Sequence, residues 1–187
     1  MLRMFVGIPV SDDYKTRLDS MVETLGGRVR SRVRWTRPGN WHVSLQFLGS
    51  VEEEDVADVR SALRGIDFSS FVMRAGDIGC FPDMRKPRVM WVGMDEGNDE
   101  CARLSEAVKD AMEPFGFKRG TQPFQAHLTL GRVKRSEPDD FASVLGNVSQ
   151  EWPELGVDRF ILWKSDLTPD GPVYTVVEEF PLGAENA

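Results

Sequence analysis

The sequence contains two histidines, and each opens the same short pattern. His42 is followed two positions later by Ser44, and His127 is followed in the same way by Thr129. Imidazole accepts or donates a proton near neutral pH, so two imidazoles around one phosphorus centre form an acid–base pair. The two hydroxyls would donate hydrogen bonds to phosphate oxygens.

Each motif needs a β-strand to place its side chains. On a strand, residues i and i+2 share one face, and the apolar residues between and after them point into a core. A lone histidine on such a strand is more often structural, but here both histidines of the chain occur in matched contexts, which favours a joint site. Nearly half of the 187 residues separates the motifs. This spacing predicts two similar lobes whose strands face each other across one cleft.

Two residues stand five positions after the histidines. Arg132 falls on the face opposite His127 by strict alternation, and reaches the site only if a bulge or twist near Gly131 re-aims it. There it would neutralise charge that develops on the phosphate. Phe47 occupies the same position in the first copy, and we expect it to face away from His42 and pack in the core.

The order of the predicted elements also repeats. Strand patterns cover 2–10, 40–48, 71–81, 87–94, 124–133, 157–164 and 173–180. Helices are expected from a Ser11 cap to Gly26, from about 52 to 65, from an Asn98 or Asp99 cap to about Phe115, and over 138–145. Each half thus runs strand, helix, histidine strand, helix, strand. Because the connections are short, we expect one domain over 1–187, built from halves of roughly 1–95 and 96–187.

Composition narrows the class of protein. Hydrophobic residues make up 41% and the net charge is −7, as in ordinary soluble proteins, and no apolar run approaches the ~20 residues that span a bilayer. The N-terminus lacks a signal-peptide pattern, so we expect a cytoplasmic protein without a membrane partner. Cys80 and Cys101 do not have the spacing of cysteines in zinc sites or redox motifs, so we expect them to be buried, reduced thiols. A disulfide between them would form only if they lie close together. No carboxylate accompanies either histidine at a fixed spacing, so we expect no metal and no cofactor.

Two longer segments resemble a known family. Trp41-His42-Val43-Ser44-Leu45-Gln46-Phe47-Leu48-Gly49 and His127-Leu128-Thr129-Leu130-Gly131-Arg132-Val133 are similar to the paired motifs of the two-histidine (2H) phosphoesterase superfamily. Within it they resemble the RNA 2′,3′-cyclic phosphodiesterase branch, also called the 2′-5′ RNA ligase family. The opening segment 3–9 and the late segment 162–167 are similar to that branch too, so the resemblance runs from about 3 to 182.

The resemblance implies a two-lobed α+β fold, with antiparallel sheets around a central cleft and helices outside. It implies metal-independent hydrolysis of a terminal 2′,3′-cyclic phosphate on RNA to a 2′-phosphate. His42 would be the acid toward the 3′ oxygen and His127 the base toward water. Ser44 and Thr129 would bind the phosphate, and Arg132 matches an arginine often found after the second motif.

Several functions remain open beside this one. The same chemistry would serve a 2′-5′ RNA ligase or a 2′,5′-oligonucleotide hydrolase, and the cleft alone would serve an RNA-end binding protein without turnover. The expected partners are RNA ends or nucleoside 2′,3′-cyclic phosphates, bound by a monomer. The net charge does not exclude them, because engaging one phosphate and one or two nucleotides needs only a local positive field.

Two sets of residues are candidates for RNA contact. The first set consists of arginines that alternate with other residues: Arg28, Arg30, Arg32, Arg34 and, further on, Arg37. They form either a solvated loop or an edge strand protected by charge, or they form a basic rim that guides the RNA backbone into the cleft. Aromatic residues that flank the motif strands either pack in the core or stack against a base: Phe5, Trp35, Trp41, Phe124 and Trp163.

Overall fold

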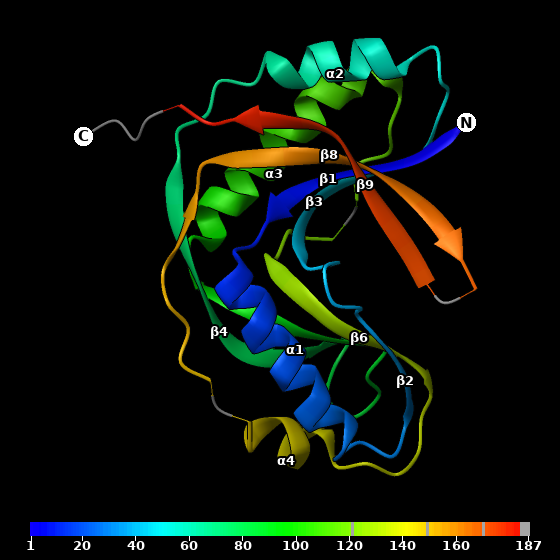
Figure 1. Cartoon of the computed structure of the whole chain (residues 1–187), viewed down its shortest axis with the longest axis vertical. Coiled ribbons are helices and arrows are strands. Elements are labelled where there is room, and N and C mark those ends of the chain that lie inside the picture. The colour runs from blue at the N-terminus through cyan, green and yellow to red at the C-terminus, as the bar shows by residue number, and fades with distance from the viewer. Residues whose placement is uncertain (121, 149, 170, 184–187) are drawn as a thin grey trace.

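The computed structural model describes residues 1–120, 122–148, 150–169 and 171–183. In that part of the chain, helices surround a nine-stranded antiparallel sheet (Figure 1). The strands are β1 (Leu2–Pro9), β2 (Arg32–Trp35), β3 (His42–Val51), β4 (Phe71–Phe81), β5 (Val89–Glu96), β6 (His127–Arg135), β7 (Leu155–Val157), β8 (Arg159–Thr168) and β9 (Gly171–Pro181). The helices are α1 (Asp12–Gly26), α2 (Val56–Arg64), α3 (Asn98–Met112) and α4 (Phe141–Gly146), with a 3-10 turn η1 (Glu113–Phe115) after α3.

The sheet consists of two arms that meet at the motif strands. Its strand order is β7-β4-β5-β6-β3-β1-β8-β9, and β2 pairs with β6 beside this path. Each neighbouring pair inside an arm shares several registered residues, whereas β3 and β6 share one, Val43 with Leu128. We call this junction the seam. Figure 1 shows the arms diverging from it, and the result is the predicted α+β fold with antiparallel strands.

Each arm takes strands from both halves of the sequence. In one arm, β1 pairs with β3 on one side and with the late strand β8 on the other. In the other arm, β5 pairs with the late strand β6, and β4 pairs with β7. The repeat is therefore folded so that neither half of the sequence forms one arm alone.

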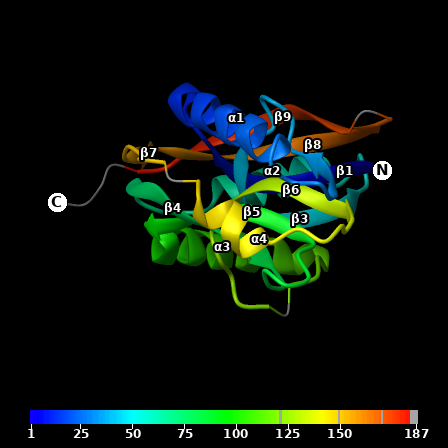
Figure 2. The same ribbon diagram turned by 90° about the horizontal axis from the view of Figure 1, so that it is seen from below.

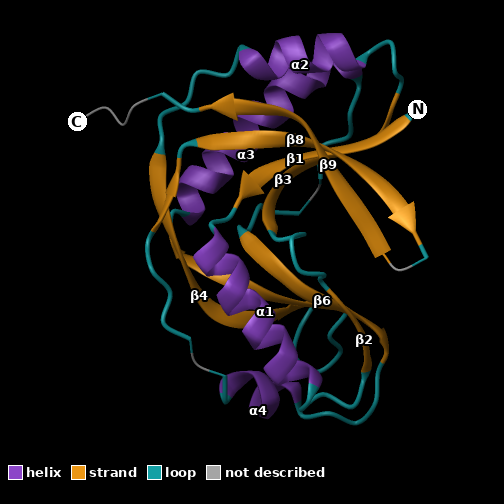
Figure 3. Ribbon diagram, in the orientation of Figure 1, coloured by secondary structure: helices purple, strands orange, loops and turns teal. Residues whose placement is uncertain are grey.

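The helices cover the outer faces of the arms. The Tyr14 hydroxyl of α1 donates to the Pro153 carbonyl at 2.7 Å and accepts from the Ala75 amide at 3.1 Å, which fixes α1 against β4. The Ser105 hydroxyl of α3 donates to the Leu45 carbonyl at 2.8 Å and fixes α3 against β3. Figure 2 shows α1 and α3 on opposite sides of the strands, and Figure 3 shows the helices outside them.

The structure changes several predicted boundaries. Of the segment with alternating arginines, the part from Arg32 forms the strand β2. The short strand β7 has no counterpart among the predicted strands. The cap of α3 is Gly97 rather than Asn98 or Asp99, and α4 begins later than predicted, after an Asp140 cap. The second motif strand begins at His127 itself.

Two expectations from composition can be compared with the structure. Cys80 and Cys101 are free and buried as predicted, and burial raises the pKa of their thiols to about 11 and about 12. Among the described residues, no helix has the length and apolar character needed to cross a membrane.

Candidate active site at the seam

The seam brings the two histidines to one surface. Val43 and Leu128 pair in antiparallel register, and both side chains are fully buried. Because strand side chains alternate, the residues beside this pair point to the opposite face, away from the core. His42 and His127 thus lie on the same face, one on each motif strand.

The register of β3 and β6 sets each histidine opposite the hydroxyl residue of the other motif. Pairing of 43 with 128 sets Ser44 opposite His127, and it sets His42 opposite Thr129. The two imidazoles occupy diagonal positions, for which Cα atoms are about 7–8 Å apart and side chains still reach each other. The structure therefore gathers the four motif side chains into one cluster, in which each histidine faces the hydroxyl of the other motif.

The backbone holds both imidazoles in the same way. Nδ1 of His42 lies 2.8 Å from the Asn40 carbonyl oxygen, and Nδ1 of His127 lies 2.8 Å from the Gln125 carbonyl oxygen. A carbonyl oxygen accepts only, so each Nδ1 carries the proton. The second ring nitrogen, Nε2, then has a free lone pair in each neutral imidazole.

Burial keeps both imidazoles neutral. It lowers the pKa of His42 from 6.5 to about 4, against the effect of the Asn40 carbonyl, and protonation of His127 would lower this pKa further. Burial also lowers the pKa of His127, and the positive charge of Arg132 lowers it further, against the effect of the Gln125 carbonyl. A buried imidazole without a counter-charge loses hydration when it is protonated. Both rings are therefore neutral in the free protein near pH 7.

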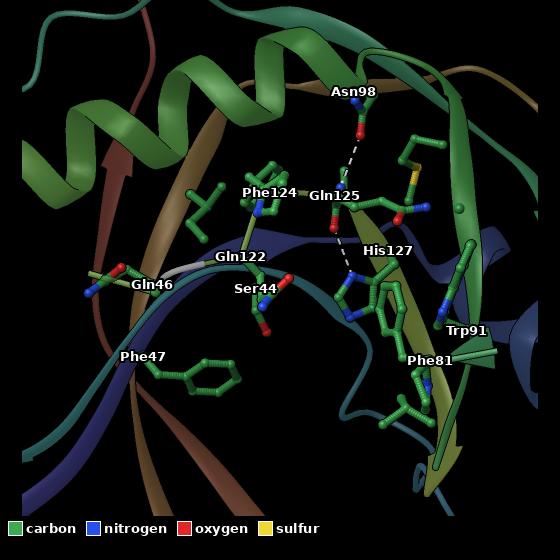
Figure 4. Close-up of a pocket in the computed structure, with 18 of the residues that line it drawn as sticks. Ser44, Gln46, Phe47, Phe81, Trp91, Asn98, Gln122, Phe124, Gln125 and His127 are labelled. Atoms are coloured by element: carbon green, nitrogen blue, oxygen red, sulfur yellow. Dashed lines mark hydrogen bonds between the residues drawn. The ribbon is translucent and has the colours of Figure 1, made fainter. Parts of the chain in front are cut away.

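Aromatic side chains surround each ring. The ring of His42 lies 4.7 Å from that of Phe5, 5.6 Å from that of Trp163 and 5.3 Å from that of Tyr174. His127 has an edge contact with Phe81 at 5.2 Å, and the ring of Trp91 lies 4.9 Å from that of Phe81 and 6.2 Å from that of His127 (Figure 4). These walls exclude water from one side of each imidazole and account for the burial.

Both motif strands carry a β-bulge at the same place. In β3, Gln46 pairs with Val6 and Ser44 pairs with Gly7, so Leu45 is left over. In β6, the residues on either side of Leu130 are paired with consecutive residues of β5, so Leu130 is left over. Each extra residue follows its histidine by three positions and shifts the alternation of the strand beyond it.

The bulge in β6 turns Arg132 toward the site. Arg132 lines the same cavity as His42 and Thr129. Its positive charge adds to the burial that lowers the pKa of His127, and it opposes the burial that raises the pKa of Tyr174. The sequence predicted that Arg132 would reach the cleft only with a bulge or twist near Gly131, and the bulge at Leu130 provides it.

The matching bulge in β3 makes the prediction for Phe47 wrong. Phe47 is 60% exposed and lines the cleft on both sides of the seam. Strict alternation from His42 placed it in the core, but the extra residue Leu45 reverses the face. Phe47 and Arg132 thus hold equivalent positions in the two copies of the motif.

Two cavities open from the seam, and both reach Ser44 and Phe47. The smaller, of about 340 Å³, contains His42, Thr129 and Arg132. The larger, of about 1370 Å³, extends past His127 toward Phe124 and the start of α3 (Figure 4). The motif side chains therefore lie where the two cavities meet.

The smaller cavity is strongly basic. In the described part of the chain, the four arginines that line it form no ion pair: Arg3, Arg34, Arg37 and Arg132. The alternating arginines thus divide by role. Arg34 and Arg37 face this cavity, whereas Arg30 contacts Asp139 and Arg28 donates to the Asn147 carbonyl.

The aromatic residues that were candidates for base stacking fall into two groups, one in the core and one beside the site. Trp41 is buried and donates to Asp19 at 2.7 Å, so it belongs to the core. Phe5 and Trp163 pack against His42, whereas Trp35 and Phe124 line the cavities. Sequence reasoning missed the remaining walls because the strands that carry them have no motif: Phe81, Trp91 and Tyr174.

The fold and the paired histidines define a class of two-lobed proteins with an internal repeat. A family model described as LigT-like phosphoesterase matches the chain twice, at residues 8–91 and 92–174. The chain belongs to this family.

Curated relatives match nearly the whole chain. An RNA 2′,3′-cyclic phosphodiesterase of Archaeoglobus fulgidus is 36% identical over 96% of this chain and 99% of its own length. An enzyme with the same name from Thermotoga maritima is 32% identical over 95% of this chain and 94% of its own length.

Solved structures share the fold. A protein of Thermus thermophilus superposes with a TM-score of 0.82 at 27% identity and covers 99% of this chain and 100% of its own. Escherichia coli LigT, crystallised with 3′-AMP, superposes with a TM-score of 0.77 at 22% identity, over 97% of this chain and 98% of its own.

Proposed function

We propose that the protein hydrolyses the 2′,3′-cyclic phosphate at RNA ends, leaving a 2′-phosphate. The observation that carries the proposal is the pair of imidazoles on one face of the seam, each with its Nδ1 bonded to a backbone carbonyl, so that the lone pair of each neutral ring is on Nε2. Relatives with 36% and 32% identity that are named RNA 2′,3′-cyclic phosphodiesterases support the substrate class.

The two histidines would divide the proton transfers. Neutral His127 takes a proton from water at Nε2 while the water oxygen attacks phosphorus. The bond from phosphorus to the 3′ oxygen breaks, and protonated His42 gives its proton to that oxygen. The sum is addition of one water molecule, with hydroxyl on phosphorus and hydrogen on the 3′ oxygen. No step requires a metal.

The low pKa of His42 fits the role of acid. An imidazolium with a pKa near 4 is a stronger acid than one at 6.5, so it protonates an alkoxide leaving group readily. The negative phosphate raises this pKa when it binds, because an opposite charge favours the protonated ring. Binding of substrate therefore loads His42 with the proton that it later delivers.

The remaining cluster would stabilise the phosphorane-like transition state. Hydroxyls of Ser44 and Thr129 flank the histidines on the same face, where they can donate to the non-bridging oxygens. The Arg132 guanidinium adds positive charge in the same cavity as Thr129. Donors fixed before the reaction stabilise charge that grows on these oxygens.

The chemistry of the two cavities suggests how an RNA end lies. The basic cavity offers guanidiniums for backbone phosphates, among them those of Arg34 and Arg37, which form no ion pair with the residues that the structure describes. The larger cavity offers aromatic walls, including Trp91 and Phe124, against which a base can stack. The cyclic phosphate would sit between them at the seam.

Turnover assays test the proposal. Purified protein is incubated in EDTA with nucleoside 2′,3′-cyclic phosphates and with short RNAs that end in one, and the products are identified by phosphorus NMR. We expect a 2′-phosphate, and a loss of about 10²–10⁴-fold in kcat for both His42→Ala and His127→Ala, as for removal of a general acid or base. Binding of RNA ends without turnover by the wild type would overturn the proposal in favour of a binding protein.

A further inference from the structure

The side chain of Asn98, at the start of α3, contacts the residue just before the motif strand β6. Asn98 is the first residue of α3, and the capping residue before it, Gly97, has no side chain with which to cap. A polar side chain at the capping position would serve the exposed amides of the helix, but Asn98 stands one residue after it. Asn98 Oδ1 instead accepts from the Ala126 amide at 3.0 Å, across the chain (Figure 4).

Gly97 makes this contact possible. Its φ of 81° lies in the left-handed region that favours glycine. A Cβ atom at Gly97 would also stand 2.6 Å from Cβ of Met73 and 2.6 Å from the Val72 carbonyl oxygen. The tight turn from β5 into α3 thus depends on this glycine, and it sets Asn98 beside the start of β6.

One peptide group joins Asn98 to His127. The Ala126 amide belongs to the same peptide plane as the Gln125 carbonyl, and this carbonyl accepts from His127 Nδ1 at 2.8 Å. Ala126 is fully buried, so its amide cannot replace this hydrogen bond with one to water. Fixing one end of the plane fixes the other, and an amide that donates at its N–H polarises its carbonyl and strengthens it as an acceptor.

We propose that Asn98 is a positioning residue for His127: through the peptide between Gln125 and Ala126, it holds the imidazole in one orientation and keeps the proton on Nδ1. The proposal rests on the proposed function, in which Nε2 of His127 must be free to take a proton. Without Asn98 the peptide can tilt, and the carbonyl no longer dictates the tautomer.

His42 is held by a different route, which provides an internal reference. Its carbonyl partner belongs to Asn40, whose own side chain donates to the Pro172 carbonyl at 2.8 Å. The support for His42 therefore comes from β9, and the support for His127 comes from α3. A change at Asn98 should alter His127 and leave His42 as it was.

NMR of the imidazole nitrogens tests the proposal without substrate. The chain has two histidines, so nitrogen–proton correlation spectra report each tautomer separately. We expect Nδ1–H for both rings in the wild type, and a mixture with Nε2–H at His127 alone in Asn98→Ala. Asn98→Asp keeps an acceptor in the same place and should keep the wild-type tautomer. Asp99→Ala, one residue further along the first turn of α3, controls for loss of helix stability.

Kinetics should follow the tautomer. We expect kcat to fall about tenfold in Asn98→Ala, as for the loss of partners that orient active groups, with KM nearly unchanged and with Asn98→Asp close to the wild type. If Asn98→Ala does not fold, Asn98→Ser is used, because serine suits a helix start but is too short to reach Ala126.

Two results would overturn the inference. One is an unchanged Nδ1–H tautomer at His127 in the alanine or serine variant, and the other is an altered tautomer with unchanged kcat. A wild-type protein without hydrolytic activity would remove the proposed function, but the tautomer measurement would still show whether Asn98 orients the ring.

Discussion

Ser44 stands opposite His127 across the seam, although the two residues belong to different copies of the motif. The same register sets Thr129 opposite His42. Each half of the repeat therefore supplies the hydroxyl that faces the other half's histidine. A shift of either motif strand by one residue would turn its histidine and its hydroxyl into the core, so the buried pair of Val43 and Leu128 determines whether the site exists.

The hydroxyl of Ser44 can be tested directly. We expect Ser44→Ala to lower kcat/KM by about 10–100-fold, since a hydrogen bond to a charged group contributes about 1.5–3 kcal/mol. Ser44→Thr keeps the hydroxyl and suits a strand, so it should retain most of the activity. Steady-state kinetics on a nucleoside 2′,3′-cyclic phosphate measures both. Equal losses in the two variants would show that the size of the side chain matters and the hydroxyl does not.

The pH dependence of the reaction follows from the lowered pKa values. In the free protein the pKa of His42 is about 4 and that of His127 is also lowered, so kcat/KM should peak below 6.5 and decline toward higher pH as the acid loses its proton. Bound phosphate raises the pKa of both rings, so the limbs of the kcat profile should lie at higher pH. Profiles of both constants between pH 4 and 9 check this, and identical limbs would contradict it.

The arginines offer a matched pair of variants. Arg34 lines the basic cavity without an ion pair among the described residues, whereas Arg30 contacts Asp139 at 3.5 Å. Arg34→Ala should weaken binding of a short RNA that ends in a cyclic phosphate, and should reduce the salt slope by about 0.7. A mononucleotide cyclic phosphate should be affected less.

Arg30→Ala is the control for that measurement. It should leave the affinity for RNA near that of the wild type, because the exposed guanidinium of Arg30 lies outside the cavity, and Asp139 still accepts from the amides of residues 30 and 31 in the variant. Similar losses of RNA affinity in both variants would indicate a general effect of net charge rather than a subsite at Arg34.

The histidine motifs could be predicted because they are local. A period of two residues places His42 with Ser44, and His127 with Thr129, on one face whatever the strands pair with. The helical stripes were predictable for the same reason, as in α1, where the predicted Ser11 cap accepts from the Tyr14 amide. These features depend on a few consecutive residues.

The errors arise where pairing with other strands decides the result. Leu45 is an extra residue only relative to β1, so the reversed face of Phe47 could not be read from β3 alone. The walls around His127 come from Phe81 and Trp91 of β4 and β5, which carry no motif. No short stretch of sequence predicts that each arm takes a strand from the other half of the chain.

Gly131 connects the bulge to the basic cavity. A Cβ atom there would lie 2.7 Å from Cγ1 of Val33 and 3.0 Å from Cε3 of Trp35, so alanine would push β2 away from β6. We expect Gly131→Ala to cost about 1–3 kcal/mol of unfolding free energy, as overpacking does, and to weaken RNA binding because Arg34 moves with β2. Gly146, where a Cβ atom meets nothing within 4 Å, provides the control: Gly146→Ala should change stability by less than about 0.5 kcal/mol.

We propose that the whole chain folds as a single domain, because the arms exchange strands. Phe5 of β1 pairs with Trp163 of β8, and Phe71 of β4 pairs with Val157 of β7. A fragment of residues 1–95 would lack β8 beside β1, and a fragment of residues 96–187 would lack β1 and β5. Each would expose long strand edges and the apolar faces that they carry.

Separate expression of the two fragments tests this prediction. Each fragment alone should show no cooperative unfolding when it is followed by circular dichroism during heating. Its backbone amides should exchange freely with solvent. Mixing the two should restore cooperative unfolding, and should restore hydrolysis if His42 and His127 act together, because the seam forms only when both motif strands are present. A fragment that unfolds cooperatively by itself would show that one half is an independent unit, and that the exchange of strands is not needed for folding.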